Sequence, residues 1–399
     1  MSSLGVWMWP QSIRISGAKR IVSRCARIGV TDIFFLAKGL AGTTAHFSQY
    51  APACCERDLL RELLDQAHLQ GIRVHAWLTS ASDEHYKALH PQSGRVHITR
   101  GADKGLISLD NSAYIAYMQQ IISELCRLYD IDGLHLDYIR YNHLLYGWSD
   151  ADCARYAAAG ADPDHLRSLM ARTFLHEGNN EPECIFQALR SGDESVLALA
   201  STRRQDVVRF AQALTCAARA QKSSLTLSAA LMPEGAYDDI AFSDLHYGQN
   251  YEDAAQLFDI VMPMAYSKAY EKDSQWVQSV AQGAIRRGLK TIIGLHAYNG
   301  GTAASLRSDI AALAGESIGG VCLFREGAFA AAIPDGGRLR LINMLDQPIT
   351  SVVSTDGASL LPAGKTISPG EEVLLLRSSA LQAAFSGDHE ICVFMPSRE

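Results

Sequence analysis

The chain has 399 residues, of which 48% are hydrophobic and 20% are charged, a balance typical of a globular protein with a large core. Its formal net charge of -7 argues against a nucleic-acid-binding protein, which normally carries a basic excess on one face. The composition therefore favours a neutral or weakly charged small-molecule partner.

The sequence shows no segment for membrane insertion or export. No run of 18 apolar residues occurs, so no transmembrane helix is expected. Residues 1–9 lack a basic region and lead straight into a predicted strand, which predicts a cytoplasmic protein, or a secreted or periplasmic one if a leader has been removed. The nine cysteines include no C-x-x-C pair, and no Cys/His cluster has zinc-ligand spacing. We therefore expect free thiols, no metal and no cofactor, while the oligomeric state stays open.

Eight short apolar runs alternate with amphipathic segments along most of the chain. The runs are residues 5–9, 32–37, 72–78, 133–137, 225–231, 259–264, 291–295 and 320–324. Helical periodicity follows at 57–70, 113–129, 203–220, 275–287 and 303–313. Eight alternating units predict an α/β fold, a (β/α)₈ TIM barrel over residues 1–337. An open doubly wound sheet is the alternative, but no G-x-G-x-x-G follows the first strand.

Two segments extend beyond a minimal barrel. Residues 142–201 form a long insertion after the fourth strand, with helical stretches at 151–159 and 166–174, and such insertions often act as lids or pocket walls. Residues 338–399 are strand-like and interrupted by Asp356-Gly357 and Pro369-Gly370 turns. We expect a helical lid and a small β-rich C-terminal domain.

The active site of such a barrel lies at the carboxyl ends of its strands. Aromatic and charged residues gather there, as expected for a site that stacks on sugar rings and hydrogen-bonds their hydroxyls. The predicted substrate-binding residues are Trp7, Lys38, Trp77, His135, Tyr138, Arg140, Tyr266, His296, Tyr298 and Glu326. Trp7 and Trp9 could equally pack at the barrel floor. His75 and His135 are expected to orient carboxylates rather than to transfer protons.

Asp137 is the predicted central carboxylate. Side chains alternate along a strand, so His135 and Asp137 share one face while Leu134 and Leu136 share the other. A charged side chain inside a barrel is costly unless it lies at the open, functional end. A purely structural pairing of Asp137 with Arg140 or His135 is the alternative.

The segment D-G-L-H-L-D-Y-I-R-Y at residues 132–141 resembles the strand-four segment of the glycosyl-hydrolase-like 10 group of bacterial glycosidases. The similarity extends to residues 247–251 and 259–266, and so covers residues 5 to 324. The resemblance implies a TIM-barrel glycoside hydrolase that acts on an oligosaccharide or polysaccharide and has Asp137 in its site. The chitinase pattern D-G-x-D-x-D-x-E is not met, because His135 and Ile139 replace its second Asp and its Glu.

Glycoside hydrolysis requires a second carboxyl group, and Glu234 after the fifth strand is the preferred candidate. Adjacent strand ends can place two carboxyls about 5–5.5 Å apart, the separation that leads to retention. Glu234 could also be an ordinary loop carboxylate, and Glu271, Asp273 and Glu326 are alternatives. Two other functions remain open. One is a non-catalytic carbohydrate-binding barrel. The other is a phosphosugar isomerase or aldolase using Lys38 and the Asn299-Gly300-Gly301 loop.

Overall fold

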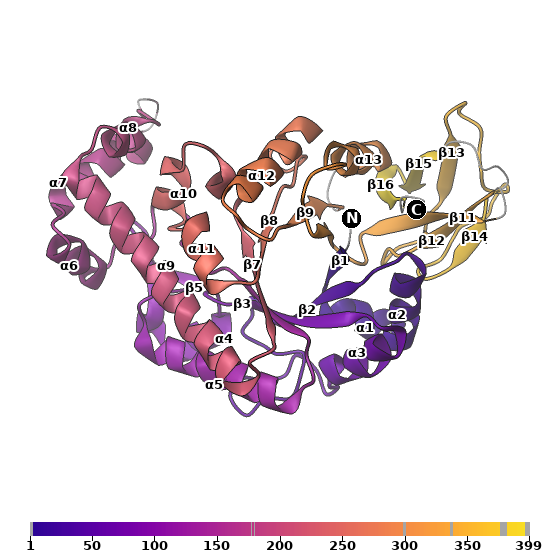
Figure 1. Ribbon diagram of the computed structural model, residues 1–399, viewed down its shortest axis with the longest axis horizontal. Helices are drawn as coiled ribbons and strands as arrows, with labels where there is room; N and C mark the ends of the chain where they lie inside the picture. The colour runs from indigo at the N-terminus through magenta and orange to yellow at the C-terminus, as the bar shows by residue number, and fades with distance from the viewer. Residues whose placement is uncertain are drawn as a thin grey trace.

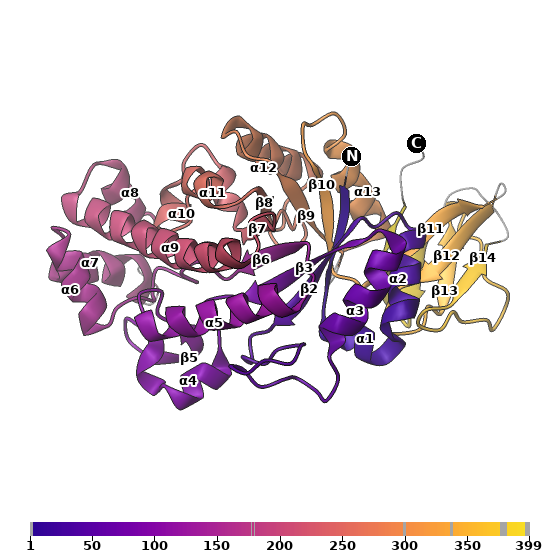
Figure 2. The ribbon, with the colours of Figure 1, turned by 60° about the horizontal axis from the view of Figure 1, so that its bottom comes forward.

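Eight parallel strands form the central barrel of the computed structural model, which describes residues 3–176, 178, 180–297, 301–335, 338–375 and 381–395 (Figures 1 and 2). The strands are β1 (Ser3–Met8), β2 (Asp32–Lys38), β3 (Arg73–Thr79), β6 (Gly133–Asp137), β7 (Thr226–Leu231), β8 (Ile260–Pro263), β9 (Ile292–His296) and β10 (Gly320–Phe324). They pair in the order β8-β7-β6-β3-β2-β1-β10-β9. Bridges from Val261 to Thr291 and from Met264 to Gly294 join the two ends. The predicted TIM-barrel fold is confirmed.

Helices that connect successive strands cover the outside of the barrel (Figure 2). They are α1 (Pro10–Ser16), α2 (Ala18–Arg27), α3 (Leu59–Ala67), α5 (Ser112–Leu128), α9 (Glu194–Gln221), α10 (Ala241–His246), α11 (Tyr251–Leu257), α12 (Ser274–Arg286) and α13 (Ala303–Ala312). In α3, Leu59, Leu60, Leu63 and Leu64 are all buried, as their helical spacing predicts. The side chain of Asp58 caps this helix by accepting a hydrogen bond from the Arg61 N–H. Among the described residues, no helix is both long and apolar enough to span a membrane.

A six-stranded sheet takes the place of a helix after β10. It consists of β11 (Phe329–Asp335), β12 (Arg338–Asn343), β13 (Ser351–Ser354), β14 (Glu372–Leu374), β15 (Leu381–Ser386) and β16 (His389–Phe394), in the order β13-β15-β16-β11-β12-β14. Phe329, Ile342 and Phe394 on this sheet belong to the same buried cluster as the barrel. Because β11 pairs with β12 and β16, the sheet begins ahead of the expected boundary at residue 338.

The insertion after β6 forms a separate helical body at the end of the molecule opposite this sheet (Figure 1). It contains α6 (Asp150–Ala158), α7 (Pro163–Met170), the π-helical turn Ala171–Leu175, α8 (Cys184–Arg190) and the first turns of α9. Tyr156, Leu166 and Ile185 belong to its own hydrophobic cluster. A second excursion, after β3, carries α4 (Glu84–Leu89) and the hairpin β4 (Gly94–His97) and β5 (Gly101–Ile107), which the sequence analysis did not anticipate.

The barrel interior holds a ring of polar and aromatic side chains near the amino ends of the strands. Asp32 accepts hydrogen bonds from Arg73, at 2.7 and 2.8 Å, and from Ser3, and it lies 2.9 Å from His75 Nε2. Burial alone would raise the pKa of Asp32, but these hydrogen bonds hold it well below its usual range. His75 also stacks on Phe34, with ring centroids 4.5 Å apart.

Gly133 makes room for the His75 ring. A Cβ atom at residue 133 would collide with His75 Nδ1 and would lie 2.8 Å from the carbonyl oxygen of Thr226. The glycine that precedes Leu134 and His135 is therefore a packing requirement of the barrel, rather than a turn residue.

We expect Gly133→Ala to lower the free energy of unfolding by about 1–3 kcal/mol, because an added methyl group overpacks the interior. Urea unfolding monitored by circular dichroism measures the change. Gly39→Ala is the matched control, since a Cβ there would make only an ordinary contact with Leu36, at 3.5 Å. Equal stability of the two variants would contradict this account of Gly133.

Candidate active site

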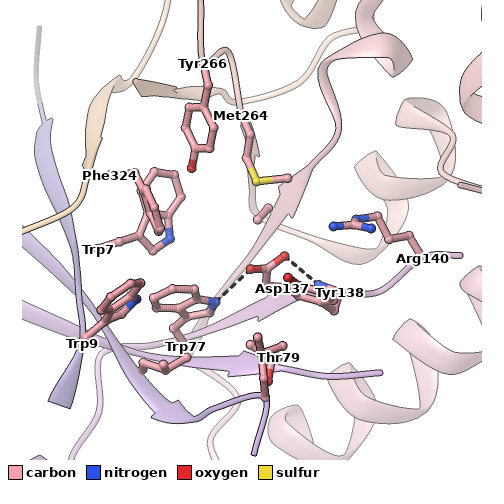
Figure 3. A pocket seen from close by; sticks show the side chains of 13 residues that line it. Trp7, Trp9, Trp77, Thr79, Asp137, Tyr138, Arg140, Met264, Tyr266 and Phe324 are labelled. Atoms are coloured by element: carbon pink, nitrogen blue, oxygen red, sulfur yellow. Dashed lines mark hydrogen bonds between the residues drawn. The ribbon is translucent and has the colours of Figure 1, made fainter. Parts of the chain in front are cut away.

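A cavity of about 380 Å³ opens at the carboxyl ends of the barrel strands, and its wall is mostly aromatic and aliphatic (Figure 3). A volume of this size lies in the range of small-molecule sites, which is about 300–1,000 Å³. The lining residues are Trp7, Trp9, Leu36, Leu40, Trp77, Thr79, Asp137, Tyr138, Arg140, Ala230, Met264, Tyr266 and Phe324. Among the described residues of this wall, Asp137 is the one carboxylate and Arg140 is the one cation.

Asp137 ends β6, and two N–H donors hold its carboxylate. The indole Nε1 of Trp77 on β3 donates to Oδ2 at 3.2 Å, and the backbone N–H of Tyr138 donates to Oδ1 at 2.7 Å (Figure 3). Tyr138 has a φ of 56°, a left-handed conformation that is uncommon for a bulky residue. This turn aims the Tyr138 N–H back at the carboxylate, and strain of this kind concentrates at functional sites.

The environment of Asp137 favours its protonated form. Its exposed fraction is 7%, and burial raises the pKa of its carboxyl group above the usual range. The charge of Arg140 and the hydrogen bonds from Tyr138 and Trp77 act in the opposite direction and only partly offset the burial. A carboxyl group with a raised pKa is suited to proton transfer, and in its ionised form it can act as a nucleophile.

His135 lies below the cavity floor and is neutral. Trp7 Nε1 donates to His135 Nε2 at 3.1 Å, and His135 Nδ1 lies 2.9 Å from the Ser228 hydroxyl. Because an indole N–H can only donate, His135 Nε2 must accept, and the ring proton is therefore on Nδ1. Burial and the neighbouring His75 hold the pKa of His135 well below its usual range. His135 thus fixes the Trp7 ring under the cavity and does not reach it.

Glu234 lies outside the cavity wall, on the short 3₁₀ helix Pro233–Ala236 after β7. Its carboxylate accepts hydrogen bonds from the hydroxyls of Tyr247 and Tyr270, both at 3.5 Å. Burial raises its pKa, and Arg140 is among the groups that lower it. Arg140 also acts on Asp137, so the guanidinium is electrostatically coupled to both carboxylates.

The cavity wall brings together six of the residues predicted from the sequence: Trp7, Trp77, Asp137, Tyr138, Arg140 and Tyr266. Trp7 serves both roles considered for it, since it packs in the core and forms part of the cavity floor. The hydroxyl of Tyr266 points into the cavity (Figure 3). His296 stacks behind Tyr266, with ring centroids 5.3 Å apart, and so supports the wall from outside.

Lys38 and Glu326 are not among the described residues that line the cavity, and both are corrected as binding residues there. Lys38 is fully buried and forms an ion pair with Asp83 at 2.8 Å, and burial lowers its pKa. Glu326 faces Arg24 of α2 at 3.7 Å, and burial raises its pKa to about 7. Both pairings join residues that are distant in sequence, so strand position alone could not reveal them.

Several other expectations can be placed on the structure. Glu271 and Asp273 are exposed, and Asp273 caps α12 by accepting from the Trp276 N–H at 3.0 Å. Tyr298 and residues 299–300 of the predicted phosphate loop lie outside the described residues. None of the described residues of the insertion at 142–201 lines the cavity, and the lid role remains a prediction.

The sequence analysis did not assign binding roles to the remaining lining residues: Trp9, Leu36, Leu40, Thr79, Ala230, Met264 and Phe324. Most are apolar residues at strand ends and look like core residues in sequence. Their position at the carboxyl end of each strand is the one signal that could have found them. Within the described part of the chain, no group of three or more His, Cys, Asp or Glu side chains is placed to hold a metal ion.

Comparison with known proteins agrees with this architecture. A model of the glycosyl hydrolase-like 10 family matches residues 49–303, which is more than half of the chain. A search of curated proteins gives no match. The glycoside hydrolase domain of PgaB (BpsB) from Bordetella bronchiseptica is similar in structure, with a TM-score of 0.64 and 14% identity over 82% of this chain and 94% of that chain.

Two further solved structures share the fold over part of their length. A β-galactosidase from Marinomonas ef1 has a TM-score of 0.57 and 14% identity, over 81% of this chain and 54% of that chain. Alpha-L-fucosidase isoenzyme 2 from Paenibacillus thiaminolyticus has a TM-score of 0.56 and 15% identity, over 82% of this chain and 46% of that chain. At these identities the likeness concerns the fold alone.

We expect Trp77→Phe to raise the pKa of Asp137 further, because the variant lacks the indole N–H that stabilises the ionised carboxylate. Carbon-13 NMR titration of labelled aspartate side chains measures this pKa directly. Trp148→Phe is the control, since its indole N–H donates to Leu144 within the insertion. An unchanged or lowered pKa of Asp137 in the Trp77 variant would show that the indole does not stabilise the carboxylate.

Proposed function

The chain belongs to the glycosyl hydrolase-like 10 family, and on that basis we propose that it is a glycoside hydrolase that cleaves a glycosidic bond in an oligosaccharide or polysaccharide. One observation carries the proposal: a single buried carboxylate, Asp137, reaches a cavity walled by tryptophan and tyrosine rings at the catalytic end of a TIM barrel. Flat rings stack on the C–H faces of pyranoses, and the carboxylate supplies the reactive group.

In the proposed mechanism, Asp137 in its ionised form, which Arg140 and the N–H groups of Tyr138 and Trp77 favour, is the nucleophile, and Glu234 is the acid, with retention of anomeric configuration. Asp137 is the last residue of β6, and Glu234 follows β7, the neighbouring strand of the barrel. Burial raises the pKa of Glu234, which favours the protonated form that an acid needs. Tyr247 connects Glu234 with Arg140. Its hydroxyl donates a hydrogen bond to Glu234, and its ring centroid lies 5.9 Å from the guanidinium carbon of Arg140.

A second function is favoured by one specific observation: the described residues that line the cavity include no carboxylate besides Asp137. A barrel with aromatic walls but no acid opposite Asp137 would bind a saccharide without cleaving it. Calorimetric binding of an oligosaccharide with no release of new reducing ends would identify this non-catalytic function.

Asp137→Asn should abolish hydrolysis and leave the fold intact, because it removes the ionisable group and nearly conserves its volume. A screen of the purified protein against aryl glycosides and oligosaccharides of varied linkage supplies the substrate for the assay. Circular dichroism reports on the fold. Asp132→Asn, at the opposite end of the same strand, is the matched control and should retain activity. Wild-type turnover by the Asp137 variant would exclude the proposed role.

Glu234→Gln should reduce turnover by about 10²–10⁴-fold, the usual contribution of a general acid or base. The alkaline limb of the pH–rate profile should also disappear, because it reflects loss of the Glu234 proton. Proton NMR of the first-formed product tests retention. A wild-type rate in this variant, with a loss in Glu271→Gln, Asp273→Asn or Glu326→Gln, would move the acid to one of those residues.

A further inference from the structure

Among the described residues, Arg140 has no hydrogen-bond or ion-pair partner for its side chain. Its side chain is half-buried in the cavity wall, and its buried Nε has no hydrogen-bond partner. Its side-chain contacts with charged or aromatic groups are with the faces of two rings, Tyr138 at 4.8 Å and Tyr247 at 5.9 Å from the guanidinium carbon. Over the described ranges, the other arginines without a side-chain hydrogen bond or ion pair are all exposed: Arg14, Arg20, Arg100, Arg127 and Arg338.

The two nearby carboxylates do not neutralise this charge. Asp137 is held by the N–H groups of Trp77 and Tyr138, and Glu234 is held by two tyrosine hydroxyls. Neither forms an ion pair with Arg140, although both are within its electrostatic influence. In addition, burial raises the pKa of both carboxyl groups, which reduces the negative charge available to Arg140.

The backbone around Arg140 is firmly held. The Arg140 carbonyl accepts from the buried side chain of Arg95 at 3.0 Å, and the next residue, Tyr141, donates its N–H to the Tyr247 carbonyl at 2.9 Å. The Tyr141 hydroxyl donates to Asp206 at 2.7 Å. A guanidinium group presents its N–H donors in one planar fork, and the buried Nε of Arg140 has no hydrogen-bond partner among the described residues. In Figure 3 the guanidinium of Arg140 points toward the cavity, on the side of Asp137.

From this geometry we infer that the cavity binds a sugar that carries a carboxylate, whose two oxygens pair with the guanidinium of Arg140. A planar carboxylate matches the fork of donors on an arginine, and such bidentate pairs are the strongest charge-assisted hydrogen bonds. The inference rests on the proposed function, since it names the class of saccharide that the proposed hydrolase would act on. It narrows the neutral or weakly charged partner that the net charge of the chain suggested.

The test compares acidic oligosaccharides with their carboxyl-reduced forms, in which each carboxylate has become a hydroxymethyl group. The panel includes uronic acids, sialic acids and sugars with an ether-linked carboxylate. Isothermal titration calorimetry is carried out with Asp137→Asn, so that bound saccharides stay intact. At least one acidic member should bind tenfold or more tightly than its reduced form, since a charge-assisted hydrogen bond contributes about 1.5–3 kcal/mol and 1.4 kcal/mol corresponds to tenfold.

Adding Arg140→Gln to this variant should remove the preference, so that the acidic and the carboxyl-reduced forms bind with similar affinity. Adding Arg20→Gln instead should preserve the preference, because Arg20 is exposed on α2 outside the barrel. The inference is overturned if no acidic member is preferred, or if the preference survives in the Arg140 variant. If the wild-type protein prefers acidic sugars through Arg140 but releases no new reducing ends, the hydrolase proposal fails and the carboxylate site stands. If the wild-type protein cleaves only neutral sugars, the hydrolase proposal stands and the carboxylate site is overturned.

Discussion

The carboxylate of Asp137 lies in a mostly apolar cavity and is held there by one indole N–H and one backbone N–H. Much of the surrounding structure serves this arrangement. β3 supplies Trp77, and the left-handed turn at Tyr138 supplies the second donor. A buried carboxylate without such donors would carry a large desolvation penalty. The two donors offset part of this penalty, so that the group keeps a raised pKa and a fixed orientation.

Beneath the cavity, the barrel interior holds polar side chains among aromatic and aliphatic ones. His135 accepts a hydrogen bond from Trp7 through Nε2, and its protonated Nδ1 faces the Ser228 hydroxyl. At the other end of the barrel, Asp32 is paired with Arg73 and His75. These contacts position the Trp7 ring as a rigid cavity floor. Burial raises the pKa of Asp137 at the mouth of the barrel, whereas several hydrogen bonds lower the pKa of Asp32 at its base. The pKa values of the two aspartates are therefore shifted in opposite directions.

The strand pattern was sufficient to predict the barrel, because its eight apolar runs are short, regularly spaced and separated by helical periodicity. Asp137, Tyr138 and Arg140 were also predictable, since alternation along one strand and position at its end place them at the mouth. Lys38 and Glu326 were not, because each is neutralised by a residue from another element, Asp83 or Arg24. The C-terminal sheet was expected as an appendage. It covers the barrel after β10 through Phe329, Ile342 and Phe394, which depends on tertiary packing.

We propose that water is added across a glycosidic bond in the cavity at Asp137. The most direct measurement is mass spectrometry of oligosaccharides incubated with the purified protein in ¹⁸O-labelled water. The account predicts shortened oligosaccharides with one ¹⁸O atom at each new reducing end, and intact oligosaccharides when the Asp137→Asn protein is used. Saccharides that bind in the cavity but remain uncleaved and unlabelled by the wild-type protein would contradict it.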